Sequence, residues 1–208
     1  MQLTWKGFAV REARSIIDEW ERQFGALTLP VPVDDIADLL CTLSIDITNS
    51  LPTEMAGRLQ VEDRIIEVRD SDIPTRQRFT VAHEIGHYRL HVLAEKLHLQ
   101  GFMCNHEQIA AIGEQSSFAN DALPGFDVPM TPRPRVLSDK DKRRLEIEAN
   151  TFGSELLMPA RLIEEAVNQY GADVRELAAR FDVSPIAMRY RLEKMLYIPS
   201  RGQKSLFD

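Results

Sequence analysis

The pentapeptide His83-Glu84-Ile85-Gly86-His87 constrains this chain more than any other part of its sequence. On an α-helix, residues four apart lie on the same face, with Cβ atoms roughly 5–6 Å apart. Two imidazole nitrogens at that spacing can bind one zinc ion at about 2.0–2.1 Å each. Glu84 is rotated about 100° around the helix, so its carboxylate can reach a water molecule without being a ligand. The pattern therefore predicts metal-assisted peptide hydrolysis, with Glu84 as the general base.

The sequence around this motif favours a helix over residues 74–97 that packs closely against another segment. Pro74 is well suited to the first turn of a helix, because its missing N–H has no intrahelical partner there. Gly86 lies inside the helix, where glycine costs about 1 kcal/mol relative to alanine. A glycine at this position indicates that another backbone approaches the motif closely.

A catalytic zinc ion usually has three protein ligands and one open position, so one ligand must come from elsewhere. His91 extends the histidine series, but on a helix it lies about 12 Å along the axis from His83 and cannot share its ion. A carboxylate on a second helix is a better candidate. Glu146 is favoured, because Asn150 lies one turn later and its amide oxygen can accept the ring N–H of a zinc-bound histidine. Glu148, rotated by about 200° around that helix, is the alternative ligand.

The composition is that of an ordinary globular protein. The chain has 208 residues, 44% of them hydrophobic and 27% charged, enough for one good-sized domain with a small appendage. It contains no apolar run long enough to span a bilayer, and its first residues lack the plan of a secretory signal. Two cysteines and a net charge of −7 favour a cytoplasmic protein without membrane partners and argue against generic nucleic-acid binding.

Hydrophobic periodicity predicts an α+β fold that is mostly helical with a small β-sheet. A first amphipathic helix ends near Gly25, and a short second helix is capped by Asp34 and Asp35. Residues 44–48 alternate like a strand, and residues 59–61 and 65–68 form a hairpin through Glu62 and Asp63. A further helix extends from residue 138 to residue 157, and three more helical stretches follow it.

These elements suggest a metallopeptidase core over residues 1–160, a helical subdomain packed on it over residues 161–198, and a tail over residues 199–208. Within the core, residues 100–138 are rich in glycine and proline and are predicted to be an irregular insertion. This insertion contains Cys104 and His106, and either side chain is a minor candidate to cover the open zinc position as a latch.

The helical subdomain resembles a helix-turn-helix over residues 174–192. Leu177, Ala178, Phe181 and Val183 are expected to pack inward, and Ser184 caps the second helix. Residues 159–208 contain 8 Lys and Arg against 7 Asp and Glu, a balance of +1. Because a DNA-binding unit needs a positive surface, packing or protein docking is favoured over DNA contact.

Two segments together resemble a known family. These are residues 76–87, Arg-Gln-Arg-Phe-Thr-Val-Ala-His-Glu-Ile-Gly-His, and residues 146–159, Glu-Ile-Glu-Ala-Asn-Thr-Phe-Gly-Ser-Glu-Leu-Leu-Met-Pro. Over residues 8–196 the chain is similar to the ImmA/IrrE-type zinc metallopeptidases. The resemblance implies a thermolysin-like minimal metallopeptidase fold, zinc on His83, His87 and Glu146, and Glu84 as the general base.

The resemblance also implies a biological role and leaves alternatives open. Members of this family often cleave a helix-turn-helix repressor encoded nearby, which derepresses stress or mobile-element genes. The alternatives are a non-catalytic zinc-containing regulator and a toxin–antitoxin component, either of which would act by binding DNA or protein. A purely structural zinc site has no need of Glu84, which favours the enzyme. The oxyanion donor stays open among Tyr88, His91, His106 and Tyr170.

Overall fold

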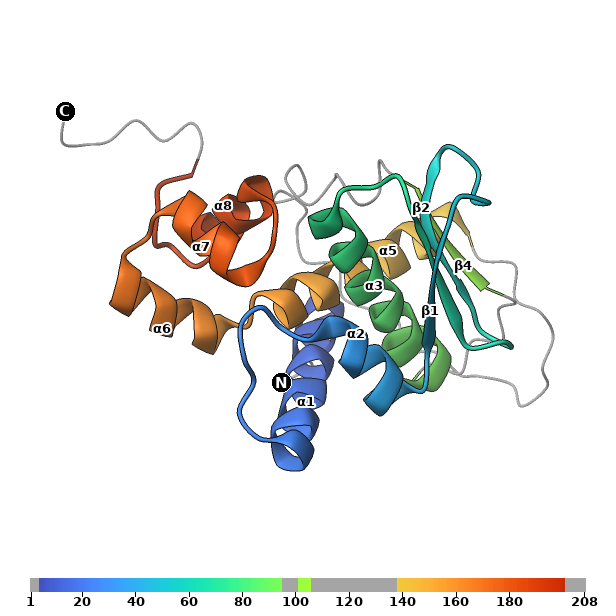
Figure 1. Ribbon diagram of the computed structural model, residues 1–208, viewed down its shortest axis with the longest axis horizontal. Helices are drawn as coiled ribbons and strands as arrows, with labels where there is room; N and C mark the ends of the chain where they lie inside the picture. The colour runs from blue at the N-terminus through green and yellow to red at the C-terminus, as the bar shows by residue number, and fades with distance from the viewer. Residues whose placement is uncertain (1–3, 95–100, 106–137, 201–208) are drawn as a thin grey trace.

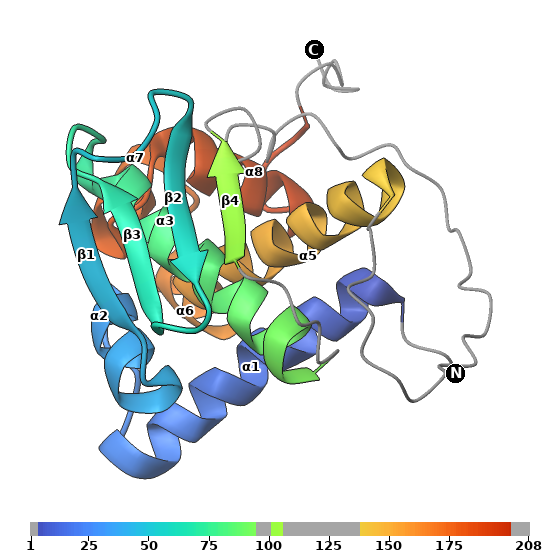
Figure 2. The same cartoon turned by 90° about the vertical axis from the view of Figure 1, so that its right-hand side faces the viewer.

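The computed structural model describes residues 4–94, 101–105 and 138–200. In these ranges the fold is α+β, with helices packed against one side of a four-stranded sheet (Figures 1 and 2). The helices are α1 (Trp5–Phe24), α2 (Val33–Asp35), η1 (Ile36–Leu40), α3 (Pro74–His87), η2 (Tyr88–Ala94), α5 (Asp139–Leu157), α6 (Ala160–Tyr170), α7 (Val174–Phe181) and α8 (Pro185–Lys194). The strands are β1 (Ser44–Thr48), β2 (Met55–Gln60), β3 (Ile65–Arg69) and β4 (Gly101–Asn105).

The sheet has the strand order β1-β3-β2-β4. The predicted hairpin is confirmed, since β2 and β3 pair antiparallel with Leu59 opposite Ile66. β1 pairs with β3 in parallel, and β4 pairs antiparallel with β2 at the opposite edge. β4 lies inside residues 100–138, so the prediction that this whole range is irregular was wrong. The remainder of that range, including His106, and the side chain of Cys104 lie outside what the structure describes.

The two faces of the sheet differ in chemistry because β2 and β3 alternate between them. Leu59, Ile66 and Val68 are buried on the face that packs against the helices. Arg58 and Glu67 are register partners on the other face and form an ion pair. In Figure 2 this outer face is turned toward the viewer, and no helix of the described residues covers it.

Helix α3 packs directly against the sheet, α5 packs against α3, and α1 packs against α5 (Figures 1 and 2). The buried face of α1 carries small and branched residues at helical spacing, including Ala9, Ala13 and Ile16. α5 begins with a capping box, in which Ser138 and Asp141 each accept a hydrogen bond from the other's backbone N–H. No helix in the described part of the chain is long and apolar enough to cross a membrane.

The C-terminal helices α6, α7 and α8 gather at one end of the molecule, on the left in Figure 1. Their buried residues, such as Phe181 and Met188, belong to the same apolar core as those of α1, α3 and α5. Glu155 of α5 accepts hydrogen bonds from Arg14 of α1 at 3.0 Å and from Arg191 of α8 at 2.5 Å. This buried carboxylate therefore links the C-terminal helices to the rest of the core.

Candidate metal centre

The centre is built where α3 and α5 cross in close contact. A Cβ atom on Gly86 would lie 3.2 Å from the Cα and O atoms of Ala149, and one on Gly153 would lie 3.3 Å from the backbone N of His83. Both contacts are shorter than side chains normally make, so each helix contributes a glycine to the crossing. The close backbone approach that Gly86 predicted is confirmed. It places residues 149–153, in the second half of α5, directly against the His83–His87 turn of α3.

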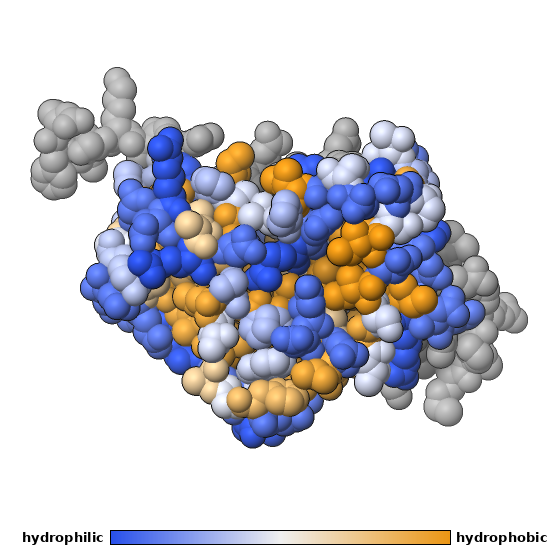
Figure 3. All heavy atoms as spheres, in the orientation of Figure 1, coloured by the Kyte–Doolittle hydropathy of each residue, from blue (hydrophilic) through white to orange (hydrophobic). Residues whose placement is uncertain are grey.

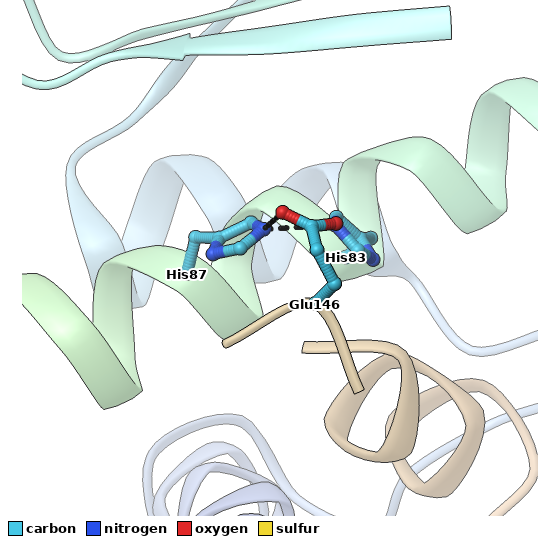
Figure 4. A group of neighbouring side chains, drawn as sticks. All are labelled: His83, His87 and Glu146. Atoms are coloured by element: carbon cyan, nitrogen blue, oxygen red, sulfur yellow. Dashed lines mark hydrogen bonds and ion pairs between the residues drawn. The ribbon is translucent and has the colours of Figure 1, made fainter. Parts of the chain in front are cut away.

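Three potential metal ligands converge at this crossing (Figure 4). The Nε2 atoms of His83 and His87 are 2.9 Å apart, and each lies 3.4 Å from a carboxylate oxygen of Glu146. Both imidazoles are fully buried, and the Glu146 side chain is 15% exposed. One ligand atom from each residue lies within 4.8 Å of the other two. Over the described residues, no other group of three His, Cys, Asp or Glu side chains meets this condition.

His83 is held by Asn150 of α5, whose amide was predicted to accept from one of the two motif histidines. Its Nδ1 atom lies 2.9 Å from Asn150 Oδ1. Since a carbonyl oxygen can only accept, we assign the hydrogen to Nδ1. The lone pair of His83 is then on Nε2, directed at His87 and Glu146. Glu146 and Asn150 thus act on the same histidine from successive turns of α5.

His87 is held by a longer chain of side chains that sequence reasoning missed. Its Nδ1 atom lies 3.0 Å from Nδ1 of His91, and Nε2 of His91 lies 3.0 Å from a carboxylate oxygen of Glu148. Arg144 approaches the other oxygen of Glu148 at 3.4 Å. The sequence had presented His91 as an excluded ligand and Glu148 as a rival ligand. The four-residue spacing from His87 to His91 was the signal, because it places both rings on one helix face.

The chemistry of this cluster fits a bound cation. Glu148 as a carboxylate accepts a hydrogen from His91 Nε2, so His91 Nδ1 accepts in turn and the remaining hydrogen is on His87 Nδ1. Both Nε2 atoms therefore present lone pairs to one another across 2.9 Å, beside the Glu146 carboxylate. Three acceptors that converge without a donor repel one another in a buried place. A zinc ion, which binds imidazole nitrogen and carboxylate oxygen in tetrahedral sites, removes that repulsion.

The pKa values of the three residues shift in different directions, because burial opposes the attraction between the imidazoles and the Glu146 carboxylate. Burial and the neighbouring His83 lower the pKa of His87 to about 3, although Glu146 opposes this. Burial is the largest single effect on His83 and disfavours its charged form, but the interactions with Glu146, Glu84 and Asn150 together outweigh it, so the pKa of His83 is raised. The pKa of Glu146 is lowered despite burial, because both imidazoles interact with it. A proton and a metal cation therefore compete for the lone pair of His83 Nε2.

Glu84 lies on a different side of α3 from the two histidines. Its side chain is fully buried, and a Cβ atom on Gly57 of β2 would lie 3.6 Å from Glu84 Oε1. The same Cβ would lie only 2.3 Å from Thr80 Cγ2, so glycine at this position lets α3 approach the sheet. α3 therefore directs its histidines toward α5 and its glutamate toward β2.

The candidates for an oxyanion donor are widely separated. Tyr88 is buried at the start of η2, and His91 is bonded to both His87 and Glu148. Tyr170 stacks under Arg180, whose guanidinium carbon lies 3.4 Å from the ring centroid. Tyr170 also lines a cavity of about 360 Å³ together with Leu29 and residues of α6 and α7. His83, His87 and Glu146 do not line this cavity. His106 is outside the described residues.

Comparison with known proteins identifies the class to which this fold and cluster belong. An α+β core with a His-Glu-x-x-His helix crossed by a glutamate-bearing helix defines a metallopeptidase-like protein. A family model described as the IrrE N-terminal-like domain, named as a peptidase family, matches residues 42–115 and 131–193. The chain therefore belongs to the IrrE N-terminal-like domain family, as its sequence predicted.

A solved structure supports the fold independently. A chain described as a Mycobacterium tuberculosis transcriptional regulator is similar with a TM-score of 0.56 and 16% sequence identity. The match covers 88% of this chain but only 55% of that one, so this protein spans about half the length of its structural relative. A comparison with curated proteins found no match.

Proposed function

We propose that this protein is a zinc-dependent endopeptidase. The observation that carries the proposal is the convergence of His83 Nε2, His87 Nε2 and the Glu146 carboxylate, all acceptors, on one buried point. Membership of a family named for peptidases supports the same conclusion. The three proposed metal ligands and the proposed general base all come from α3 or α5.

Each residue has a distinct role in this proposal. His83, His87 and Glu146 would hold the zinc ion, and Asn150 would fix the tautomer of His83 through the 2.9 Å contact. Zinc, when bound, supplies the Lewis acid for peptide hydrolysis. Glu84 would accept the proton of the attacking water and pass it to the leaving amine. Glu84 is fully buried, so bulk water is kept away from its carboxylate.

The proposed substrate is a protein that regulates transcription, such as a helix-turn-helix repressor. The family resemblance suggests this target, together with control of stress or mobile-element genes. The similar solved structure is itself described as a transcriptional regulator. This chain matches only 55% of that relative, so a role in transcription is proposed for this protein and does not follow from the similarity.

The non-catalytic alternative, a regulator that binds DNA through α7 and α8, has less support. In these helices Arg180 pairs with Glu176 at 2.7 Å and Arg189 pairs with Glu193 at 2.8 Å. Arg191 is buried against Glu155. These pairs neutralise three of the four arginines in α7 and α8, which a DNA-binding surface would need.

The test compares cells that express the wild-type protein with cells that express Glu84→Gln. New protein N-termini would be labelled and identified by mass spectrometry in both. Under the proposal, a small set of N-termini depends on Glu84, and the cleaved proteins include a DNA-binding repressor. The purified wild-type protein with zinc should then cleave that repressor at the same bond. Identical sets of N-termini in the two cell lines would contradict the proposal.

A further inference from the structure

The two histidines of the candidate centre are supported in different ways. His83 donates to a neutral amide, Asn150, on the neighbouring helix. His87 instead contacts His91, one turn later on η2, and His91 contacts the buried carboxylate of Glu148. The two supports therefore differ in charge as well as in length.

The second support is a continuous chain of buried polar groups. His87 and His91 are fully buried with ring centroids 5.1 Å apart, and the Glu148 side chain is 4% exposed. The two contacts of His91, at 3.0 Å each, use both of its ring nitrogens. Arg144, one turn before Glu148 on α5, provides the balancing positive charge at 3.4 Å. These hydrogen-bonded side chains thus connect η2 to α5 beside the candidate metal centre.

The direction of the hydrogen bonds follows from the carboxylate at the far end. Glu148 accepts, so His91 donates from Nε2 and accepts at Nδ1. His87 must then donate from Nδ1, which leaves its Nε2 lone pair for the cluster. Asn150 imposes the same tautomer on His83. Without His91, the buried Nδ1–H of His87 would lose this acceptor, and the ring could turn or change tautomer.

We propose that His91 and Glu148 are positioning residues that orient His87 and fix its tautomer for metal binding. This inference rests on the proposed metal centre but not on peptidase activity. The carboxylate acts on His87 through His91, making the His87 imidazole a stronger electron donor. Supports of this kind around a metal change its affinity by about 10–100-fold.

The test measures zinc affinity by competition with a chromophoric chelator for wild type and four variants. His91→Phe removes both hydrogen-bonding nitrogens but keeps a ring. His91→Gln keeps one acceptor and one donor, and Glu148→Gln keeps an acceptor but removes the charge. Leu90→Ala is the matched control, because Leu90 is a buried neighbour on η2 and its truncation creates a cavity without removing a hydrogen bond. The thermal midpoint of each metal-free variant shows that the protein is folded.

The proposal predicts a graded series. His91→Phe weakens zinc binding by about 10–100-fold, and His91→Gln and Glu148→Gln weaken it by smaller factors. Leu90→Ala lowers the thermal midpoint but leaves the zinc affinity within about threefold of wild type. Histidine ¹⁵N spectra of the zinc-loaded protein should show a hydrogen on His87 Nδ1, and this signal should change in His91→Phe.

Two results would overturn the proposal in distinguishable ways. A folded His91→Phe protein with the affinity of Leu90→Ala would remove the positioning role and leave the proposed enzyme intact. A wild-type protein that binds no zinc would overturn the metal centre itself, and the positioning role with it. Zinc binding that falls as predicted in a protein without peptidase activity would support the inference and contradict the proposed function.

Discussion

The crossing of α3 with α5 and the pair formed by α7 with α8 are built from opposite kinds of residue. At the crossing, buried histidines and glutamates meet across backbones that Gly86 and Gly153 bring together. In α7 and α8, the buried residues are mainly apolar, such as Leu177, Phe181 and Met188. Arg180 and Arg189 form surface pairs with glutamates of their own helices, and Arg191 forms a buried pair with Glu155.

The difference indicates that the α3–α5 crossing carries the chemistry, whereas α7 and α8 contribute stability. Burying polar groups costs free energy unless they are hydrogen-bonded, and apolar residues would pack the same space more favourably. The polar crossing is therefore explained by a function that needs those groups, whereas α7 and α8 are explained by packing alone. A change at the crossing should alter metal binding or catalysis, and a change in α7 or α8 should alter stability.

The largest effect is expected from Glu84→Gln. The glutamine keeps the shape of the side chain but accepts a proton poorly, so peptidase activity should fall by about 10²–10⁴-fold. The zinc content should be unchanged, because Glu84 is not among the three converging ligands. Rates on the identified substrate measure the effect, and Glu67→Gln, which changes another buried glutamate, is the control. Full activity of Glu84→Gln would place the general base elsewhere.

Phe181→Ala should have a large effect on stability and none on zinc binding. Phe181 is fully buried in the apolar core, and truncation of such a ring costs about 3–5 kcal/mol of unfolding free energy. Urea unfolding measures the loss. At low temperature, where the variant is folded, its zinc affinity should equal that of wild type. An affinity that changes along with stability would mean that the two regions are not independent.

The pH dependence of zinc binding tests the charge of the cluster. Zinc requires neutral histidine, and the pKa of His83 is raised above its usual value of about 6.5. Zinc affinity should therefore fall as the pH decreases through this raised pKa, by about tenfold per pH unit where a single proton competes. Chelator competition over a pH series gives the profile, and calorimetry in two buffers counts the protons released. An affinity independent of pH between 6 and 8 (roughly the range where histidine titrates) would be inconsistent with proton competition at His83.

The smallest effect is expected from Arg189→Ala in α8. Its pair with Glu193 lies at the surface and joins residues one turn apart, so the change in unfolding free energy should be below about 0.5 kcal/mol. Retention on duplex DNA at moderate salt should also be unchanged. A clear loss of DNA binding would make α8 a recognition helix and reverse the contrast between the two regions.

The parts of the molecule that the sequence could predict are those determined by local patterns. The helix periods and the β2–β3 hairpin depend on residues near one another in the chain. Gly86 indicated a close backbone contact from its own position inside a helix, although its partner Ala149 is distant in sequence. Choosing Glu146 over Glu148 depended on its four-residue spacing from Asn150, and the structure brings Glu146 and Asn150 to the same histidine. The roles of these residues in zinc binding stay predictions.

The features that could not be predicted from the sequence depend on contacts between distant segments. β4 is short and lies in a region rich in glycine and proline, and its strand structure depends on pairing with β2 rather than on a local pattern. The parallel pairing of β1 with β3 is likewise nonlocal. The contact of His91 with Glu148 requires η2 and α5 to lie side by side. Its local part, the spacing from His87 to His91, was visible in the sequence but was considered only for direct metal binding.

Zinc content is the measurement that tests the central claim most directly. Wild type, Glu146→Gln and Glu148→Gln would be purified without added metal, loaded with excess zinc, passed through a desalting column and measured by plasma emission spectrometry. The account predicts about one zinc ion per chain in wild type and in Glu148→Gln, and a loss of zinc in Glu146→Gln, because three protein ligands hold a catalytic zinc. A folded wild-type protein without zinc, or a Glu146→Gln protein that retains it, would contradict the account.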